Sequence, residues 1–128
     1  MAARETIDEM LERARAGMQR MTPEQARAAM ADGGLLVDIR SESQRERDGG
    51  VAGAAAFPRN VLEWRADPTS PAHDPRFAEF GRPVIVMCDE GYQSSLAAES
   101  LRRLGFEAAT DLIGGFQAWR AAGLPTES

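Results

Sequence analysis

Two short apolar runs, each followed by a segment of helical character, constrain the fold of this chain more than any other feature. "LLVDI" occupies residues 35–39 and "PVIVMC" residues 83–88, and neither run alternates with polar residues. Continuous apolar runs of this length are typical of strands buried on both faces in a parallel sheet. The second run precedes "SSLAAESLRRLG", residues 94–105, which has helical character and ends at a glycine. This alternation predicts an α/β domain with a central, mostly parallel sheet flanked by helices.

The remaining segments fit the same alternation, without an internal repeat or a linker between domains. Residues 22–34 are the best-marked helix, because Thr22 and Gln25 match a capping box and two glycines end the segment. Ser94 or Ser95 is expected to cap the helix after the second apolar run. The other expected elements are a polar amphipathic helix at 5–20, a loop or short exposed helix at 40–50, a brief strand at 54–58, a helical turn or two at 60–67, a surface loop at 67–75, a strand at 107–112 and a closing helix at 114–125.

Charge and composition exclude several classes of function. The net charge of −5 argues against a nucleic-acid partner, because phosphates are bound by clustered positive charge. All 15 basic residues are arginine, which excludes lysine Schiff-base chemistry. With one histidine and one cysteine, we expect no metal site and no other cofactor. No apolar stretch reaches the roughly 18 residues of a membrane span, so no membrane partner is expected. A single cysteine forms no internal disulfide, which favours the cytoplasm.

The only cysteine, Cys88, ends the second apolar run where the expected strand passes into a helix. Ligands of parallel α/β sheets bind at this carboxyl edge of the strands. The next five residues, "DEGYQ", are few enough for a tight arch, in which Gly91 permits positive φ. Inward-pointing N–H groups of such an arch, together with the dipole of the next helix, favour the nucleophilic thiolate. Position alone leaves a second interpretation equally open, in which Cys88 is a small buried apolar residue.

Motifs along most of the chain resemble those of the rhodanese-like sulfurtransferases, whose single-domain members have about this length. The segment from Cys88 to Phe106 resembles their Cys-x-x-Gly-x-Arg-Ser loop and the helix after it. "LLVDIR" is similar to their Asp-x-Arg strand, "GGVAGAAAFP" to a Gly-His-Ile-x-Gly-Ala-x-x-Ile-Pro segment, and "LIGGFQAWRAAGLP" to a closing Gly-Gly-x-x-Ala-Trp motif. The matching residues are Asp38, Arg40, Gly53, Ala54, Pro58, Cys88, Gly91, Ser94, Leu104, Gly105, Phe106, Gly114, Gly115, Ala118 and Trp119.

The resemblance implies a rhodanese-like three-layer domain at residues 21–125, preceded by an N-terminal helical extension at residues 1–20. It implies a sulfurtransferase in which the Cys88 thiolate takes sulfane sulfur from a donor and forms a persulfide. The outer sulfur then passes to a thiol or another nucleophile. We expect a small-molecule or protein-bound sulfur donor and a thiol acceptor as partners, and a monomer or weak homodimer.

The resemblance also assigns roles to residues around the thiol. Asp38 and Arg40 are expected to form a polar pair near the cleft that supports the loop, or an ordinary salt link at the end of a strand. Ser94 is expected either to donate its hydroxyl to the sulfur or to cap the helix. The implied substrate-binding residues are Asp89, Glu90, Gly91, Tyr92, Gln93 and Ser94.

The loop departs from the family pattern in ways that bear on the donor. Gln93 stands where the pattern has arginine, so the loop lacks a fixed positive charge for an anion such as thiosulfate. Asp89 and Glu90 follow the thiol directly, and their carboxylates would repel a dianion and oppose the thiolate. The sequence therefore predicts that thiosulfate is a poor donor, and that a low-molecular-weight or carrier-protein persulfide serves instead. Gly50 replaces the histidine of the Gly-His-Ile segment, a change expected to be structural.

Three other functions remain as alternatives. A non-catalytic rhodanese-homology module would keep the fold and use the loop only to bind a partner; the missing arginine favours this function and the retained Cys88 opposes it. A phosphatase or arsenate reductase of the same broad fold needs a loop one residue longer, with arginine at the sixth position after the cysteine, where this chain has Ser94. A redox-sensing thiol is the third alternative, although the chain has no second cysteine to resolve it.

Overall fold

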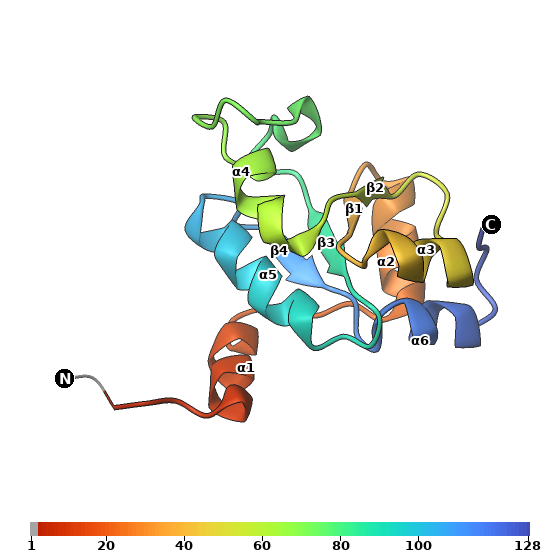
Figure 1. Ribbon diagram of the computed structural model, residues 1–128, viewed down its shortest axis with the longest axis horizontal. Helices are drawn as coiled ribbons and strands as arrows, with labels where there is room; N and C mark the ends of the chain where they lie inside the picture. Colours follow the sequence, from red (N-terminus) through yellow and green to blue (C-terminus); the bar gives the residue numbers. More distant parts are fainter. Residues whose placement is uncertain (1–2) are drawn as a thin grey trace.

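The computed structural model describes residues 3–128 and has a four-stranded parallel sheet at its centre (Figure 1). The strand order is β2-β1-β3-β4, so the two apolar runs of the sequence form the two inner strands. Between these inner strands the register pairs Leu35 with Val84 and Asp38 with Met87. The elements are α1 (Ile7–Arg15), α2 (Pro23–Ala31), β1 (Leu35–Asp38), α3 (Glu42–Asp48), β2 (Ala55–Ala56), η1 (Arg59–Val61), α4 (Leu62–Ala66), η2 (Pro75–Phe77), β3 (Val84–Met87), α5 (Gln93–Arg103), β4 (Ala109–Asp111) and α6 (Gly115–Ala121).

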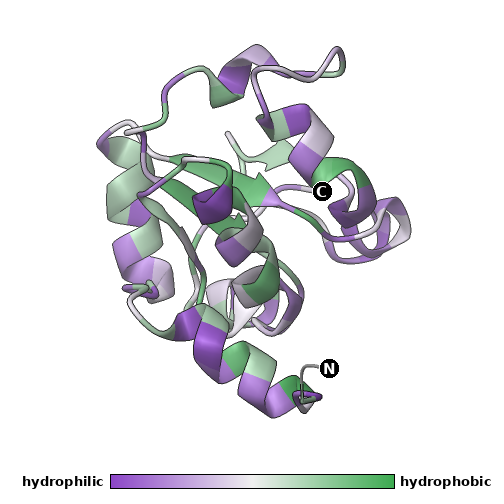
Figure 2. Ribbon diagram, turned by 90° about the vertical axis from the view of Figure 1, so that its left-hand side faces the viewer, coloured by the Kyte–Doolittle hydropathy of each residue, from purple (hydrophilic) through white to green (hydrophobic). Residues whose placement is uncertain are grey.

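The sheet separates two hydrophobic clusters, which makes the domain three-layered. Every residue of β1 and β3 is buried, as expected for strands covered on both faces. Their alternate side chains point to opposite faces, so Val37 lies in one cluster and Leu36 in the other. Helices α4 and α5 cover the first cluster, and α2 and α6 cover the second. In Figure 2 the central strands are mainly hydrophobic, whereas most helices carry both hydrophobic and hydrophilic residues.

The helix boundaries follow local sequence signals in most places. The capping box predicted for α2 is present, with Thr22 and Gln25 exchanging hydrogen bonds between side chain and backbone. The predicted helix over residues 5–20 is shorter, because α1 ends at Arg15, Ala16 is extended, and Gly17 adopts a φ of +77°.

The start of α5 corrects one prediction. Neither Ser94 nor Ser95 caps this helix; Tyr92 is at the N-cap position and its side chain makes no capping hydrogen bond. Both serine hydroxyls instead bond to a buried carboxylate on β4. Within residues 3–128, no helix is long and apolar enough to cross a membrane.

Candidate active site

Cys88 follows β3 directly, and its side chain accepts hydrogen bonds from the loop that joins β3 to α5. The backbone N–H groups of Gly91 and Ser94 both donate to Sγ, at N–S distances of 3.1 and 3.4 Å. Cys88 is 7% exposed and belongs to the hydrophobic cluster under α5, while its sulfur also contacts the loop backbone. Backbone N–H donors stabilise a negatively charged sulfur more than a neutral one. The arrangement is that of an anion cradle around one thiol.

The carbonyl groups of the loop are held on the outside of the arch. The N–H of Phe116 donates to the Cys88 carbonyl at 2.9 Å, and the N–H of Gln117 donates to the Asp89 carbonyl at 3.1 Å. The Gly91 carbonyl accepts from two arginine side chains, described below. In a planar trans peptide the C=O and the following N–H point in opposite directions. Anchoring these three carbonyls outward therefore turns the N–H groups of Asp89, Glu90 and Tyr92 toward the inside of the arch, where the N–H groups of Gly91 and Ser94 contact the sulfur.

Glycines allow the loop to lie against the start of α6. Gly91 has a φ of +90°, and a Cβ there would come within 2.6 Å of the Gly114 nitrogen. A Cβ on Gly115, whose φ is +63°, would meet the Cys88 carbonyl oxygen at 2.5 Å. A side chain at either position would displace the loop backbone, so these glycines are required by close packing as well as by backbone conformation.

A buried polar cluster lies beneath the loop. Asp111, the last residue of β4, is completely buried and accepts hydrogen bonds from the hydroxyls of Ser94 at 2.7 Å and Ser95 at 2.8 Å. Arg20 donates to the same carboxylate, with Nε 2.8 Å from Oδ1. The Ser94 hydroxyl is therefore committed to Asp111, and only the Ser94 backbone N–H reaches the sulfur. This corrects the expectation that its hydroxyl either donates to the sulfur or caps the helix.

Sequence reasoning missed three members of this site. Asp111 lies near the end of the strand predicted at 107–112, at the same sheet edge as Cys88, and that position was an available signal. Arg15 and Arg20 left no such signal, because they precede Gly91 by 76 and 71 residues.

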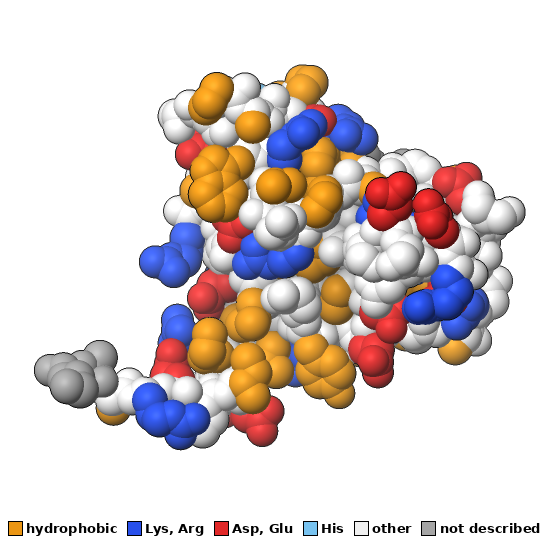
Figure 3. Space-filling model, viewed as in Figure 1, with side chains coloured by type: hydrophobic (Ala, Val, Ile, Leu, Met, Phe, Trp, Pro, Cys, Tyr) orange, Lys and Arg blue, Asp and Glu red, His pale blue; other side chains and the backbone are white. Residues whose placement is uncertain are grey.

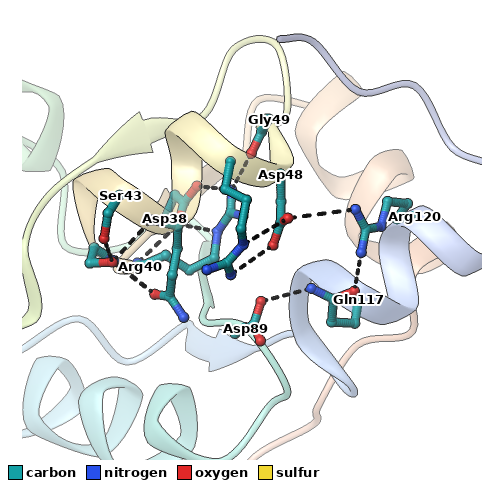
Figure 4. A network of polar contacts seen from close by, with 11 residues as sticks. Asp38, Arg40, Ser43, Asp48, Gly49, Asp89, Gln117 and Arg120 are labelled. Carbon is teal, nitrogen blue, oxygen red and sulfur yellow. Dashed lines mark hydrogen bonds and ion pairs between the residues drawn. The ribbon is translucent and has the colours of Figure 1, made fainter.

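The remaining loop side chains point in different directions. Asp89 accepts a hydrogen bond on Oδ1 from Nε2 of Gln117 at 2.9 Å, and Figure 4 shows its carboxylate directed at α6. Glu90 and Gln93 are exposed, and Tyr92 is 61% exposed. The structure thus joins only one of the two acidic loop side chains to a partner.

Asp38 and Arg40 form the expected ion pair, buried beneath α3 and α6 (Figure 4). Two hydrogen bonds join their side chains: Arg40 Nε lies 3.1 Å from Oδ1 and Nη2 lies 2.8 Å from Oδ2. Arg40 also donates to the Gly49 carbonyl at 2.8 Å and stacks on the Phe116 ring, with its Cζ 3.9 Å from the centroid. Since Phe116 bonds to the Cys88 carbonyl, the pair contacts the loop through α6. Within residues 3–128, no three His, Cys, Asp or Glu side chains are placed to bind a metal.

Fold and site together define an α/β domain that holds one thiol in an amide-lined loop at the carboxyl edge of a parallel sheet. The family model for the rhodanese-like domain matches residues 22–122, and the chain belongs to that family. The thiosulfate sulfurtransferase GlpE of Pseudomonas entomophila is 35% identical over 103 residues, which cover 80% of this chain and 85% of that protein. GlpE of Vibrio cholerae is 49% identical over 51 residues, so the matched part spans about half that protein, 48% of its length.

Solved structures share the fold. A protein of unknown function from Rhodopseudomonas palustris, RPA3614, described as a possible tyrosine phosphatase, has a TM-score of 0.89 and 34% identity, with 99% of this chain and 98% of that chain covered. The human single-domain sulfurtransferase TSTD1 has the same fold, with a TM-score of 0.65 and 23% identity over 80% of this chain and 95% of that one.

Proposed function

We propose that this protein is a rhodanese-type sulfurtransferase that works through a persulfide on Cys88. The thiolate attacks the sulfane sulfur of a donor, and a new S–S bond forms to Cys88. The bond between that sulfur and the rest of the donor breaks, and its electron pair leaves with the donor. An acceptor thiolate then attacks the outer sulfur and releases the Cys88 thiolate. Atoms and charge balance without an oxidant or a cofactor.

The observation that carries this proposal is the pair of N–H groups, from Gly91 and Ser94, directed at Sγ. Further donors are available for the outer sulfur, since within residues 3–128 the N–H groups of Glu90 and Tyr92 make no hydrogen bond. The names of the relatives point the same way, because the GlpE proteins are thiosulfate sulfurtransferases.

The proposal includes a preference among donors. Gln93 is exposed at the first position of α5, where it can donate a hydrogen bond but contributes no charge. Glu90 is exposed on the same loop and repels a dianion. We therefore propose that thiosulfate is a weak donor for this protein, and that a low-molecular-weight or protein-bound persulfide is a better one.

Intact-mass spectrometry tests the persulfide directly. We expect the protein to gain the mass of one sulfur atom after incubation with glutathione persulfide, with a smaller fraction converted by thiosulfate or mercaptopyruvate. The Cys88→Ala variant is the control and should show no gain. If none of the three donors adds sulfur to the wild-type protein, the proposal is wrong and the non-catalytic binding module takes its place.

Phosphatase activity is a distinct alternative, raised by the description of RPA3614. The sixth position after Cys88 is Ser94, whose N–H contacts the sulfur and whose hydroxyl bonds to Asp111, so this position offers no guanidinium to a phosphate. We expect no turnover of an aryl phosphate above that of the Cys88→Ser variant. Turnover that depends on Cys88 would favour the phosphatase.

A further inference from the structure

Helix α1 lies outside the residues matched by the family model, yet it packs against α5 beside the thiol loop (Figure 1). Leu11 and Ala14 are the buried residues of this helix. Figure 3 shows hydrophobic side chains gathered beside α1 on the viewed face. Because this packing fixes the end of α1 close to the loop, its last residue, Arg15, reaches the loop backbone.

Arg15 forms a bridge between the loop and α5. Its Nη2 donates to the Gly91 carbonyl at 2.9 Å, and its Nε donates to the Ser95 hydroxyl at 2.9 Å. Arg20 donates to the same Gly91 carbonyl at 2.9 Å, while its Nε is held by Asp111. One peptide carbonyl of the loop thus accepts from two guanidinium groups, whose combined charge exceeds that of the single buried carboxylate.

We propose that Arg15 is a positioning residue of the active site, and that α1 supplies to the loop the positive charge that Gln93 does not. The proposal rests on the proposed function for its relevance to sulfur transfer. Arg15 acts through the peptide between Gly91 and Tyr92. A guanidinium on the carbonyl fixes the direction of this peptide and polarises it, so that the Tyr92 N–H on the opposite side becomes a stronger donor.

Both effects favour negative charge inside the arch. A positive charge near a thiol stabilises its thiolate form, and a partly buried site screens that attraction less than bulk water does. The loop itself carries Asp89 and Glu90. The charged groups near it on the neighbouring elements are Arg15 on α1, Arg20 before α2, Asp38 and Arg40 at the end of β1, Arg47 and Asp48 on α3, Asp111 on β4 and Arg120 on α6. Of Arg15 and Arg20, Arg15 is the better subject for a test. Arg20 is paired directly with the buried Asp111 carboxylate, whereas Arg15 bonds to the Ser95 hydroxyl and the Gly91 carbonyl.

The test is the pH profile of Cys88 alkylation by iodoacetamide, which reports the thiolate without requiring sulfur transfer. In Arg15→Met we expect the midpoint of the profile to rise by about one unit, the lower end of the range for loss of a nearby charge. Arg15→Lys should recover most of that shift, because it restores the charge. The control is Arg13→Met on the same helix, because Arg13 pairs with Glu5 and Glu99 away from the loop. In this variant the midpoint of Cys88 alkylation should stay at the wild-type value.

The outcomes separate this inference from the proposed function. An unchanged midpoint in Arg15→Met overturns the role of Arg15, whether or not Cys88 takes up sulfur. A raised midpoint without sulfur uptake in any variant supports the positioning role and overturns the sulfurtransferase. If Arg15→Met fails to fold, as shown by circular dichroism, Arg15→Gln removes the same charge and retains a hydrogen-bond donor. An unchanged midpoint in Arg15→Gln would overturn the inference equally.

Discussion

At the scale of single residues, the loop depends on which backbone groups are turned inward. Cys88 receives N–H donors from Gly91 and Ser94, and the outward carbonyls of Cys88, Asp89 and Gly91 turn three further N–H groups toward the inside of the arch. Gly91 is central to this arrangement, since its N–H donates to the sulfur while its carbonyl accepts from Arg15 and Arg20. One residue thus connects the thiol to the charges behind the loop.

Replacing Gln93 with arginine tests whether missing charge limits the use of thiosulfate. Position 93 is the exposed first residue of α5, so Gln93→Arg adds a forked cation beside the arch with little effect on folding. A charge-assisted hydrogen bond contributes about 1.5–3 kcal/mol, so kcat/KM for thiosulfate should rise at least about tenfold. Sulfur transfer from thiosulfate to cyanide is the assay, with glutathione persulfide as a second donor that should gain less.

Ala31→Arg is the matched control for this substitution. It adds the same charge at the exposed end of α2, just before β1 and at the opposite edge of the sheet. Its kcat/KM for thiosulfate should equal that of the wild type. Equal gains in both variants would mean that net charge, rather than charge at position 93, governs the rate, and no gain in either would remove the charge explanation.

Predictions from sequence reached the thiol and its arch but not the residues behind them. Cys88 and Gly91 lie in one short segment, where spacing and residue type indicate a loop. The buried cluster of Ser94, Ser95 and Asp111 brings together side chains 16 and 17 residues apart, and Arg20 is 91 residues from its carboxylate. Such contacts are set by the packing of α5 on β4, which no local pattern specifies. The serine cap was predicted wrongly for the same reason, because a tertiary partner outcompeted the local one.

At the scale of elements, the strands were predicted best and the connections least well. The runs that form β1 and β3 are continuous and apolar, which left few alternatives to a buried strand. The segment at 40–50 left two alternatives open, a loop or a short helix, and it contains α3. The segment at 67–75 was expected as a surface loop, yet Asp74 in it is buried. Asp74 accepts from the N–H of Arg76 and from the side chains of Arg65 and Arg76. Both guanidinium groups lie over the ring of Phe57 in the core.

Asp74 should make stability depend on pH in the acidic range. Hydrogen bonds from Arg76 hold the pKa of Asp74 well below its usual value in the folded protein. A lowered folded-state pKa stabilises the protein above the unfolded pKa of about 3.9, and this contribution disappears as the pH falls toward the folded value. Because Arg65 and Arg76 are partly exposed, Asp74→Asn should lower the free energy of unfolding by only about 1 kcal/mol at pH 7.

Urea unfolding of the wild type and Asp74→Asn at pH 7, 4 and 2.5 measures this contribution. The difference between the two proteins should be constant from neutral pH to about pH 5 and should shrink below about pH 4. Asp32→Asn, at the exposed C-cap of α2, is the control and should differ little from the wild type at each pH. A difference for Asp74→Asn that persists unchanged at pH 2.5 would contradict an ionised role for this carboxyl group.

At the scale of the whole molecule, the fold places two buried ion pairs at the sheet edge that carries the thiol. Asp38, Cys88 and Asp111 all stand at or just after the carboxyl ends of neighbouring parallel strands. Each carboxylate has an arginine partner, Arg40 for Asp38 and Arg20 for Asp111. The edge therefore combines an anion cradle with two ion pairs. Arg20 and Asp111 are 91 residues apart, whereas Asp38 and Arg40 are close in sequence and Arg40 reaches other elements through the Gly49 carbonyl and the Phe116 ring.

The Asp38–Arg40 pair should matter to the stability of the whole domain because it is fully buried and joins β1, the end of α3 and α6. Removing one partner of a buried pair leaves an uncompensated charge and typically costs about 3–5 kcal/mol. We expect Arg40→Met to lower the free energy of unfolding by about that amount. The double variant Asp38→Asn with Arg40→Met should be more stable than Arg40→Met alone, because the stranded carboxylate is then neutral.

Urea unfolding at pH 7 gives these values, and the slope with denaturant should stay unchanged if the native fold is kept. Arg47→Met is the matched control: Arg47 pairs with Asp48 on the surface of α3, its side chain is 64% exposed, and its loss should change stability by less than about 1 kcal/mol. If Arg40→Met and Arg47→Met cost the same, the buried pair does not hold the elements together. If the double variant is less stable than Arg40→Met, the Asp38 carboxylate stabilises the domain through a contact other than the Arg40 side chain. The hydrogen bond that it accepts from the Arg40 backbone N–H is such a contact.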